Sequence, residues 1–534
     1  MRAPLVTVAI LALALPAGAS AQQSQPHEKA QQKHVHQTKG VKTGFERSGA
    51  ILARPDDTAA DPQDTHKWSG LEAAGSPHCT PHFCVHWTGT GSDGSDAAHA
   101  DQMKDILENE VFPCENTTAP TACAGSPGLG WRLPASDGTL GGDARTDVYI
   151  ENLYDSEKVF GYVATDPGQP QDPSVAHYAY MVLDKDYTRY AGGDAAGGLV
   201  AEQVTAAHEY NHILQNAYDY LEDSWMFEAT AVYMEDKVYP QDNDYLHYVP
   251  AWATNPHQPL TAFSNQNLKP YGSAVWNHWL DHRFGSGVVR SAWESSVGSA
   301  DFAPAAYSAA IGAAGGAGFS DEFDRFSAAV AEWNAPGSGF PDPYPDVVRD
   351  GTLPAGSQTS PFGLAHTTFA LFEVPVPSDS PPVIRLTATL PAGTSGAIAL
   401  VGRTGADPAA GTVTSNLTPM PAGGFGAVQL DNPAAFGRIT AVVVNSDASK
   451  AGFDFTADDY VFTKDAQDVV ATVIEPGVPI PVTGPAKSIA DHAASITGSV
   501  DPHLIDTTWT IEYGRTSSYG SSTAPQPVAG STLG

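Results

Sequence analysis

The chain has 534 residues and a formal net charge of −33, because 60 acidic residues outnumber 27 basic ones. This length favours more than one domain, since single hydrophobic cores stop growing at roughly 250–300 residues, and a hydrophobic content of 42% predicts a folded chain. The strong negative charge argues against nucleic acids and anionic membranes as partners.

The first 21 residues have the pattern of a secretory signal peptide. Arg2 supplies a positive charge, an apolar run extends from Leu5 to Leu15, and Ala19-Ser20-Ala21 is a small-x-small cleavage site. A run this short does not span a bilayer of about 30 Å as a helix. We therefore expect a secreted, extracellular protein without a membrane span. Residues 22–67 are polar and rich in Gln, His and Lys, which predicts a disordered lead-in or a propeptide.

Four cysteines follow within a short stretch: Cys79, Cys84, Cys114 and Cys123. Disulfides are favoured in an oxidising compartment. Three pairings are possible, of which Cys79–Cys84 with Cys114–Cys123 is the simplest. Histidines also lie in this segment, at positions 78, 82 and 86, so a zinc knuckle is the alternative. The acidic segment 89–96 that comes next is weakly compatible with Ca²⁺, but it fails the EF-hand pattern and favours an ordinary turn.

Residues 68–348 mix strand and helix patterns and are predicted to form one α+β domain. Alternating or continuously apolar runs predict strands over Thr146–Ile150 and Tyr178–Leu183. Helical patterns cover Leu199–Asn216, Trp225–Val238 and Tyr271–Arg283.

The first of these predicted helices carries the most informative motif, His208-Glu209-x-x-His212. Histidines four residues apart project from one face of a helix, about one turn from each other, where a single Zn²⁺ can accept both. Glu209 is rotated by about 100° and lies beside such an ion, where it can take a proton from water. A helix with solvated histidines is the alternative, but the helical context favours a zinc site.

A third ligand is needed, because catalytic zinc has three protein ligands and a water. Glu228 stands sixteen residues after His212, at the start of the second predicted helix, with the small residues Ala229 and Ala231 beside it. A helix, a short connection and an antiparallel helix would bring Glu228 to the face that carries the two histidines.

Together, His208-Glu209-x-x-His212 and Glu228-Ala229-Thr230-Ala231 resemble the gluzincins, the thermolysin-like zinc peptidases. The pattern is most similar to secreted bacterial proteins with T-A-A-H-E-Y-x-H and W-x-x-E-A-T-A motifs, which are thought to be metalloproteases. The resemblance covers approximately residues 79–296. It implies a zincin-like domain with one zinc ion on His208, His212 and Glu228, and Glu209 as the general base.

Departures from known patterns narrow this resemblance. Gln215 and Tyr218 stand where a metzincin needs Gly and His, so that class is excluded. No G-x-M-E-N strand precedes His208, which favours an endopeptidase over an aminopeptidase. Thermolysin-like enzymes carry an Asp one turn after the glutamate ligand, but this chain has Val232 there. Glu235 is a substitute for that Asp or an ordinary solvated carboxylate.

Tyr271, at the start of the third predicted helix, resembles the tyrosine of several gluzincins. It is a candidate donor to the developing oxyanion, and a packed aromatic residue is the alternative.

The remaining sequence predicts β modules. Residues 349–362 are rich in Pro and Gly and are predicted to be a linker. Short β-type runs separated by turns predict a β-sandwich over 363–473, and residues 474–534 resemble a fibronectin-III-like module but are short for a full sandwich.

The sequence thus predicts a monomeric, secreted zinc endopeptidase that acts on proteins or peptides. Its C-terminal modules are candidates for binding a surface polymer. The alternative is a non-catalytic extracellular adhesion protein with a vestigial or structural zinc fold.

Overall fold

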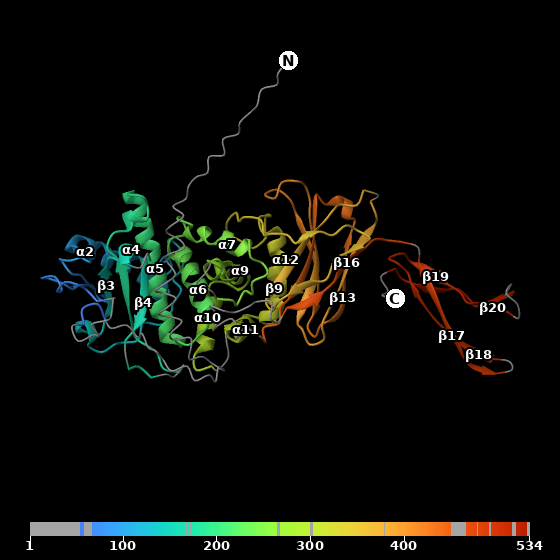
Figure 1. The fold of residues 1–534 in the computed structure, drawn as a ribbon, viewed down its shortest axis with the longest axis horizontal. Helices are drawn as coiled ribbons and strands as arrows, with labels where there is room; N and C mark the ends of the chain where they lie inside the picture. Colours follow the sequence, from blue (N-terminus) through green and yellow to red (C-terminus); the bar gives the residue numbers. More distant parts are fainter. Residues whose placement is uncertain are drawn as a thin grey trace, which may run out of the picture. The chain divides into compact units, whose positions relative to one another are not determined.

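The computed structural model describes residues 54–57, 67–156, 159–166, 168–170, 174–263, 268–299, 303–378, 380–449, 466–477, 479–490, 493–514 and 520–530 (Figure 1). The predicted signal peptide lies outside the described residues, and so does the predicted lead-in apart from 54–57 and 67. The chain is multidomain: a helical unit consists mainly of Met1–Glu322, and an all-β unit mainly of Asp346–Asp447 and Thr463–Gly534. None of the described helices is long and apolar enough to cross a membrane.

The helical unit contains a mixed sheet with strand order β1-β2-β3-β5-β4. Strands β2, β3 and β5 are parallel, whereas β1 and β4 are antiparallel to their neighbours. Both strands that the sequence predicted in this region are confirmed, as β3 and β5. The bounds are β1 His78–Cys79, β2 Phe83–His86, β3 Thr146–Glu151, β4 Gly161–Thr165 and β5 Ala179–Asp184.

The first two predicted long helices are confirmed, and the third is interrupted at Ser273. Asp194 caps the N-terminus of α5 by accepting a hydrogen bond from the backbone N–H of Gly197. The helical elements of this unit are α2 Ala97–Ile106, the π-helix η1 Leu107–Val111, α3 Phe112–Asn116, η2 Leu140–Gly142, α4 Leu153–Ser156, η3 Tyr187–Arg189, α5 Ala195–Asp219, α6 Ser224–Val238, η4 Asp244–His247, α7 Val249–Ala253, α8 Lys269–Gly272, α9 Ala274–Phe284, α10 Gly287–Ser296 and α11 Ala303–Ala313.

Helix α5 lies at the centre of the helical unit and is buried on every side from Val204 to Asp219. It packs against β4 and β5 of the sheet and against α6. Contacts between α5 and α6 run in reverse order, since His208 meets Glu235 whereas Gln215 meets Phe227. The two helices are therefore antiparallel, as the sequence predicted.

An aromatic cluster that includes Trp68, Tyr149, Tyr162 and Tyr180 packs in the same unit. The indole of Trp68 donates to the carbonyl of Ile150. A short N-terminal segment, Arg54–Asp57, joins this region, and the Arg54 guanidinium lies 5.5 Å from the centre of the Tyr180 ring. Only 6% of Arg54 is exposed, although it belongs to the stretch predicted as a lead-in.

Arg54 is enclosed by three carboxylates. Its Nε donates to Asp166 at 2.7 Å, one Nη donates to Asp137 at 2.5 Å, and the other contacts Asp147. Buried charges of this kind are costly unless they are paired, so Arg54 is required for the three aspartates to remain in the interior.

Both disulfides form between cysteines that are neighbours in sequence. Cys79 pairs with Cys84, and Cys114 pairs with Cys123, which is the simplest of the three pairings. The first bridge joins strands β1 and β2, and the second begins in helix α3.

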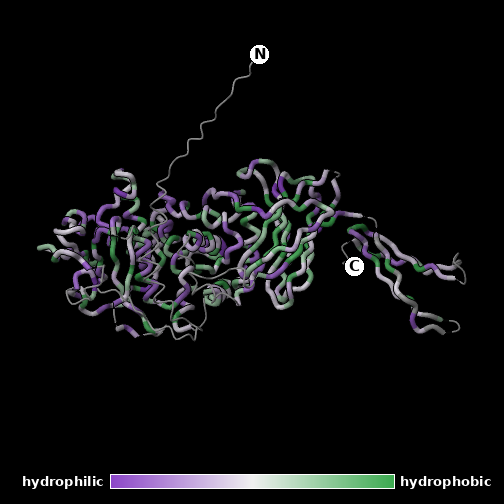
Figure 2. The backbone as a smooth tube through the Cα atoms, viewed as in Figure 1, coloured by the Kyte–Doolittle hydropathy of each residue, from purple (hydrophilic) through white to green (hydrophobic). Residues whose placement is uncertain are grey.

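The all-β unit is a sandwich of two main sheets, with strand orders β13-β10-β16-β7 and β12-β11-β14-β9-β6. Alternate residues of β10, such as Ile384 and Leu386, enter one apolar core with residues of β11 and β14, such as Ile398 and Ile439. Figure 2 shows these hydrophobic strands in green. The runs predicted over 367–372, 383–386, 397–401 and 439–444 are confirmed as strands β9, β10, β11 and β14.

The stretch predicted as a linker contributes short strands to the sandwich, since β6 pairs with β9 and β7 pairs with β16. Besides its sheets, this unit includes turn η5 and the part of helix α12 that follows Glu322. The bounds are α12 Phe319–Ala329, η5 Val330–Glu332, β6 Gly351–Thr352, β7 Ser357–Gln358, β8 Phe362–Leu364, β9 Thr368–Val374, β10 Val383–Leu390, β11 Gly396–Arg403, β12 Val413–Met420, β13 Gly424–Asp431, η6 Pro433–Ala435, β14 Arg438–Asn445, β15 Gln467–Val469 and β16 Ala471–Ile474.

The C-terminal residues form antiparallel pairs, β17 with β18, β19 with β22, and β20 with β21. Their likeness to a fibronectin-III-like module stays a prediction. The strands are β17 Ile480–Ala490, β18 Ala493–Asp501, β19 Thr507–Trp509, β20 Glu512–Gly514, β21 Gly520–Ser522 and β22 Gln526–Val528.

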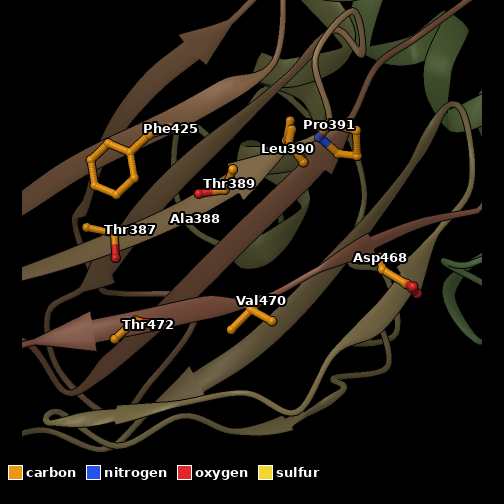
Figure 3. Close-up of a pocket in the computed structure, with 9 residues that line it drawn as sticks. All are labelled: Thr387, Ala388, Thr389, Leu390, Pro391, Phe425, Asp468, Val470 and Thr472. Atoms are coloured by element: carbon orange, nitrogen blue, oxygen red, sulfur yellow. The ribbon is translucent and has the colours of Figure 1, made fainter.

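The outer side of the sandwich carries an open hollow of about 450 Å³ (Figure 3). The exposed ring of Phe425 lies at this hollow, together with threonine side chains of β10 and β16. Its lining residues are Thr387, Ala388, Thr389, Leu390, Pro391, Phe425, Asp468, Val470 and Thr472.

Candidate metal centre

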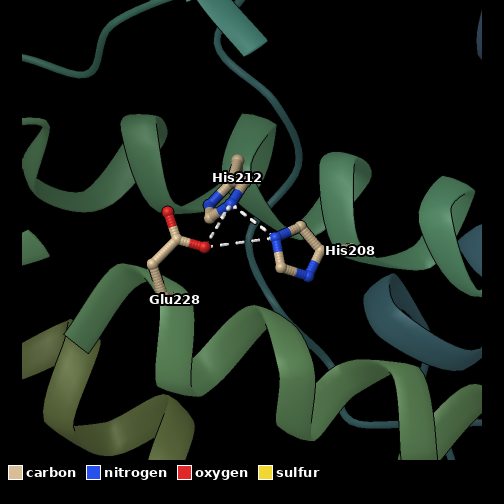
Figure 4. A group of neighbouring side chains, drawn as sticks. All are labelled: His208, His212 and Glu228. Atoms are coloured by element: carbon tan, nitrogen blue, oxygen red, sulfur yellow. Dashed lines mark hydrogen bonds and ion pairs between the residues drawn. The ribbon is translucent and has the colours of Figure 1, made fainter. Parts of the chain in front are cut away.

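Helices α5 and α6 bring together the three residues that the sequence proposed as metal ligands. The Nε2 atoms of His208 and His212 are 3.1 Å apart, and Glu228 Oε2 lies 3.3 Å and 3.7 Å from them (Figure 4). His212 and Glu228 are fully buried, and His208 is 3% exposed. Figure 4 shows the carboxylate of Glu228 and the two imidazoles directed toward one another.

These separations match the edges of a tetrahedral zinc site. Ligand atoms about 2.0–2.1 Å from Zn²⁺, at tetrahedral angles, are about 3.3–3.4 Å from one another. The three observed separations scatter around this value. Two nitrogens and one carboxylate oxygen are also a donor set that zinc prefers, so the residues present fit the ion.

The hydrogen bonds of the two Nδ1 atoms, which point away from the cluster, determine whether the Nε2 atoms carry a hydrogen or a free lone pair. His212 Nδ1 is 2.6 Å from the side-chain oxygen Oε1 of Gln215, whose Nε2 donates to Asn211 Oδ1 and to the backbone carbonyl of Phe227. Since Gln215 Oε1 can only accept, His212 Nδ1 carries the hydrogen and its Nε2 presents a lone pair. His208 Nδ1 likewise lies 2.6 Å from Glu235 Oε1. This orientation is the one that metal-binding histidines adopt.

The electrostatics of the cluster call for a cation. Burial by itself lowers the pKa of His208, but the carboxylates of Glu228 and Glu235 outweigh burial and raise it well above 6.5. Burial in turn raises the pKa of Glu235 to about 8, against its hydrogen bond with His208. The two buried carboxylates thus lie at the two ring nitrogens of His208, Glu235 at Nδ1 and Glu228 at Nε2, and either a proton on His208 or a metal ion would supply positive charge there.

Glu209 follows His208 on α5 and is 2% exposed. A Cβ atom added at Gly161, the first residue of β4, would lie 2.9 Å from Glu209 Cγ, so the strand passes very close to this side chain. Glu209 therefore lies between the ligand helix and an edge strand of the sheet, beside the proposed metal position.

Tyr271, the candidate oxyanion donor on α8, lies next to the cluster. Its ring is nearly parallel to that of His208, with 6.1 Å between ring centres, and the tilted ring of Tyr248 lies 5.4 Å from it. Tyr271 is 1% exposed, so it is also a packed aromatic residue. Its neighbourhood is compatible with either of the roles that the sequence left open.

Two partners of the histidines could not be assigned from the sequence. Glu235, for which a solvated position was equally acceptable, is buried against His208. From the sequence, Gln215 serves only to exclude a metzincin. A signal was available, because Asn211 and Gln215 are amides four residues apart on a helix whose neighbouring residues are mostly apolar.

A second group of potential ligands, Asp56, Glu72 and His86, also has atoms within 4.8 Å of one another. His86 Nδ1 bonds to Glu72 at 2.9 Å, and its Nε2 bonds to Asp147 at 3.0 Å. Because each ring nitrogen faces a carboxylate, a protonated imidazole fits this position, and the pKa of His86 is raised to about 9. We interpret this group as a charge network.

Comparisons with known proteins give little functional information. A model described as "Family of unknown function (DUF6055)" matches residues 195–337, which include α5, α6 and Tyr271. No curated protein matches the chain. Among solved structures, a "Family 16 Carbohydrate Binding Module-2" matches at 18% identity and a TM-score of 0.15, over 22% of this chain and 76% of that one.

Proposed function

We propose that this chain is a secreted, zinc-dependent endopeptidase whose helical unit is zincin-like. His208, His212 and Glu228 would hold the ion, and Glu209 would act as the general base. The observation that carries the proposal is the convergence of three buried donor atoms at tetrahedral spacing, with both outer histidine nitrogens hydrogen-bonded.

Zinc, when bound, supplies a Lewis acid that polarises a carbonyl and lowers the pKa of water toward about 7. The protein's own contribution is to hold and move protons. Glu209 would take a proton from the attacking water and deliver it to the leaving amine. Glu235 would keep the ring of His208 in place, since its carboxylate accepts from Nδ1.

Tyr271 is the candidate donor to the negative charge that develops on the carbonyl oxygen. The parallel stacking of its ring on His208 keeps the side chain beside the ligands. Tyr271→Phe would retain this packing and remove only the hydroxyl. We expect that change to lower kcat more than it raises KM.

The edge strand β4 supports a peptide as the substrate. Within the described residues, β4 pairs only with β5, so its outer edge offers main-chain hydrogen-bonding groups. An extended peptide can pair with such an edge, and here it would lie near Glu209, because Gly161 begins this strand. The nearly complete burial of the site implies that the covering elements must shift before a peptide enters.

Casein hydrolysis by the zinc-loaded wild type and by Glu209→Gln tests this proposal. We expect the variant to keep zinc and lose cleavage. Glu202→Gln is the matched control. Glu202 lies on the same helix, but its contacts are with Gln102 and His99 and not with the proposed ligands. Full activity of Glu209→Gln would refute the mechanism. Zinc retention without cleavage of casein or of a peptide library by the wild type would favour the binding alternative.

A further inference from the structure

A directional hydrogen-bond chain runs from the ligand His212 to the buried carboxylate of Glu115. His212 Nδ1 donates to Gln215 Oε1 at 2.6 Å, Gln215 Nε2 donates to Asn211 Oδ1 at 2.7 Å, and Asn211 Nδ2 donates to Glu115 Oε2 at 2.9 Å. Gln215, Asn211 and Glu115 are all fully buried. Every donor therefore faces the same way, toward the carboxylate.

Glu115 is carried by α3, which is fastened by a disulfide. The preceding residue, Cys114, pairs with Cys123, and its carbonyl accepts from the backbone N–H of Leu129. The following residue, Asn116, accepts at 2.7 Å from the hydroxyl of Tyr210, a neighbour of Asn211 on α5. Consecutive residues of α3 thus hold consecutive residues of α5, close to His212.

We propose that Glu115, Asn211 and Gln215 are positioning residues for the metal ligand His212, and that the Cys114–Cys123 disulfide keeps Glu115 in place for that task. We call these three residues and the disulfide the α3 latch. The inference rests on the proposed function, because it assumes that His212 binds zinc.

The direction of the chain explains how the latch acts on the metal. Each amide is polarised by the next, and hydrogen bonds in a row strengthen one another where the dielectric is low. The carboxylate at the end increases electron density on the imidazole of His212, which makes its Nε2 a better ligand. The same hydrogen bonds fix the orientation of the imidazole ring.

Burial of Glu115 disfavours its charged form. Burial raises the pKa of Glu115 to about 8, against the hydrogen bond from Asn211 and the positive charge of His208. A cation at the ligand cluster would favour the carboxylate further.

The first test measures the dissociation constant of Zn²⁺ by competition with a chromophoric chelator, which does not depend on activity. Gln215→Met keeps the volume and removes the acceptor, and we expect zinc to bind about 10–100-fold more weakly. Gln203→Met is the matched control on the same helix. Gln203 donates to Glu110 near the surface, so its loss is expected to change zinc affinity less than about twofold.

A pair of substitutions at Glu115 separates the hydrogen bond from the charge. Glu115→Gln keeps an oxygen that can accept from Asn211, whereas Glu115→Met removes the acceptor. We expect Glu115→Met to weaken zinc binding by about tenfold and Glu115→Gln by a clearly smaller factor. This partial rescue would not occur if Glu115 only filled space, in which case the two variants would behave alike.

The disulfide is tested by comparing the two bridges. Replacing Cys114 and Cys123 by Ala should weaken zinc binding by about tenfold, whereas replacing Cys79 and Cys84 by Ala should leave it nearly unchanged. Substitution is preferable to a reducing agent, because thiols bind zinc themselves. Equal losses in both double variants would overturn the role of this particular disulfide.

The outcomes for the latch and for the peptidase proposal can be told apart. A wild type that binds no zinc would overturn the metal site itself. A wild type that binds zinc tightly, with Gln215→Met and Glu115→Met within twofold of it, would overturn the latch and leave the metal site intact. Thermal unfolding of each metal-free variant checks that it folds. If Gln215→Met does not fold, Glu115→Gln and Glu115→Met decide the question.

Discussion

The two units of the molecule bury different kinds of side chains. The main core of the sandwich is apolar, with members such as Ile384, Leu400 and Val443. The interior of the helical unit contains carboxylates such as Glu115, Glu228 and Glu235, each fully or nearly fully buried. Burial of apolar surface stabilises a fold by itself, whereas burial of an ionisable group costs free energy unless it is compensated.

This difference indicates where function lies. The sandwich also buries charges, but Arg403 and Glu332 form an ion pair of 2.7 Å that compensates both. In the helical unit the carboxylates contact neutral amides or histidines: Glu228 and Glu235 contact His208, and Glu115 accepts from Asn211. Stability alone accounts for the first interior, whereas the second is the kind of interior in which perturbed ionisable groups mark a functional site, in keeping with the proposed metal centre.

The largest effect on stability is expected at Arg54. Arg54→Met leaves Asp137, Asp147 and Asp166 without their common partner, and removing one side of a buried ion pair costs about 3–5 kcal/mol. Urea unfolding followed by tryptophan fluorescence would measure this loss. Of the ten tryptophans, all except Trp333 and Trp509 belong to the helical unit. An unchanged midpoint would contradict the structure of this cluster.

Protonated His86 is expected to contribute about 3 kcal/mol to the free energy of unfolding, and this contribution depends on pH. The pKa of His86 rises from 6.5 to about 9 on folding, since Asp147 and Glu72 outweigh the opposing effect of burial. A raised pKa means that the stabilisation is complete below pH 6.5 and is lost as the pH rises to about 9. His86→Phe should remove this part of the pH dependence. An identical pH profile in the variant would show that His86 does not bind a proton on folding.

Removal of zinc should destabilise one unit and leave the other unchanged. At a free zinc concentration 100 times its dissociation constant, binding stabilises the helical unit by about 2.7 kcal/mol. In calorimetry, a chelator should therefore lower the unfolding temperature of the helical unit, which contains most of the tryptophans, and leave that of the sandwich unchanged. A shift of both transitions, or of neither, would remove the contrast between the two units.

The smallest effect on stability is expected for a substitution in the core of the sandwich. Ile398→Val removes one buried methylene group from its core and should cost about 0.5–1.5 kcal/mol. Because Ile398 belongs to a cluster of apolar side chains, the loss should not depend on pH or on zinc. A dependence of the Ile398→Val effect on zinc would show that the two units are energetically coupled.

The sequence predicted the parts of the site that depend on local periodicity. His208 and His212 are one turn apart on α5, and a short connection to α6 was enough to place Glu228. The contacts that depend on distant segments were not predictable. Glu115 is 96 residues from Asn211, and no spacing rule connects them. Arg54 was not distinguishable from other charged residues of a polar stretch, because its three partners lie about 80–110 residues away.

Gly161 offers a way to adjust the site without changing any of its charges. Because its Cα faces the stem of Glu209, a methyl group at this position would act as a wedge between strand and helix. Gly161→Ala would shift Glu209, the proposed general base, by about a few tenths of an ångström, and Gly161→Val would shift it further. The distance between the Glu209 side chain and strand β4 could then be varied in graded steps, while the proposed ligands, the disulfides and the net charge stay the same.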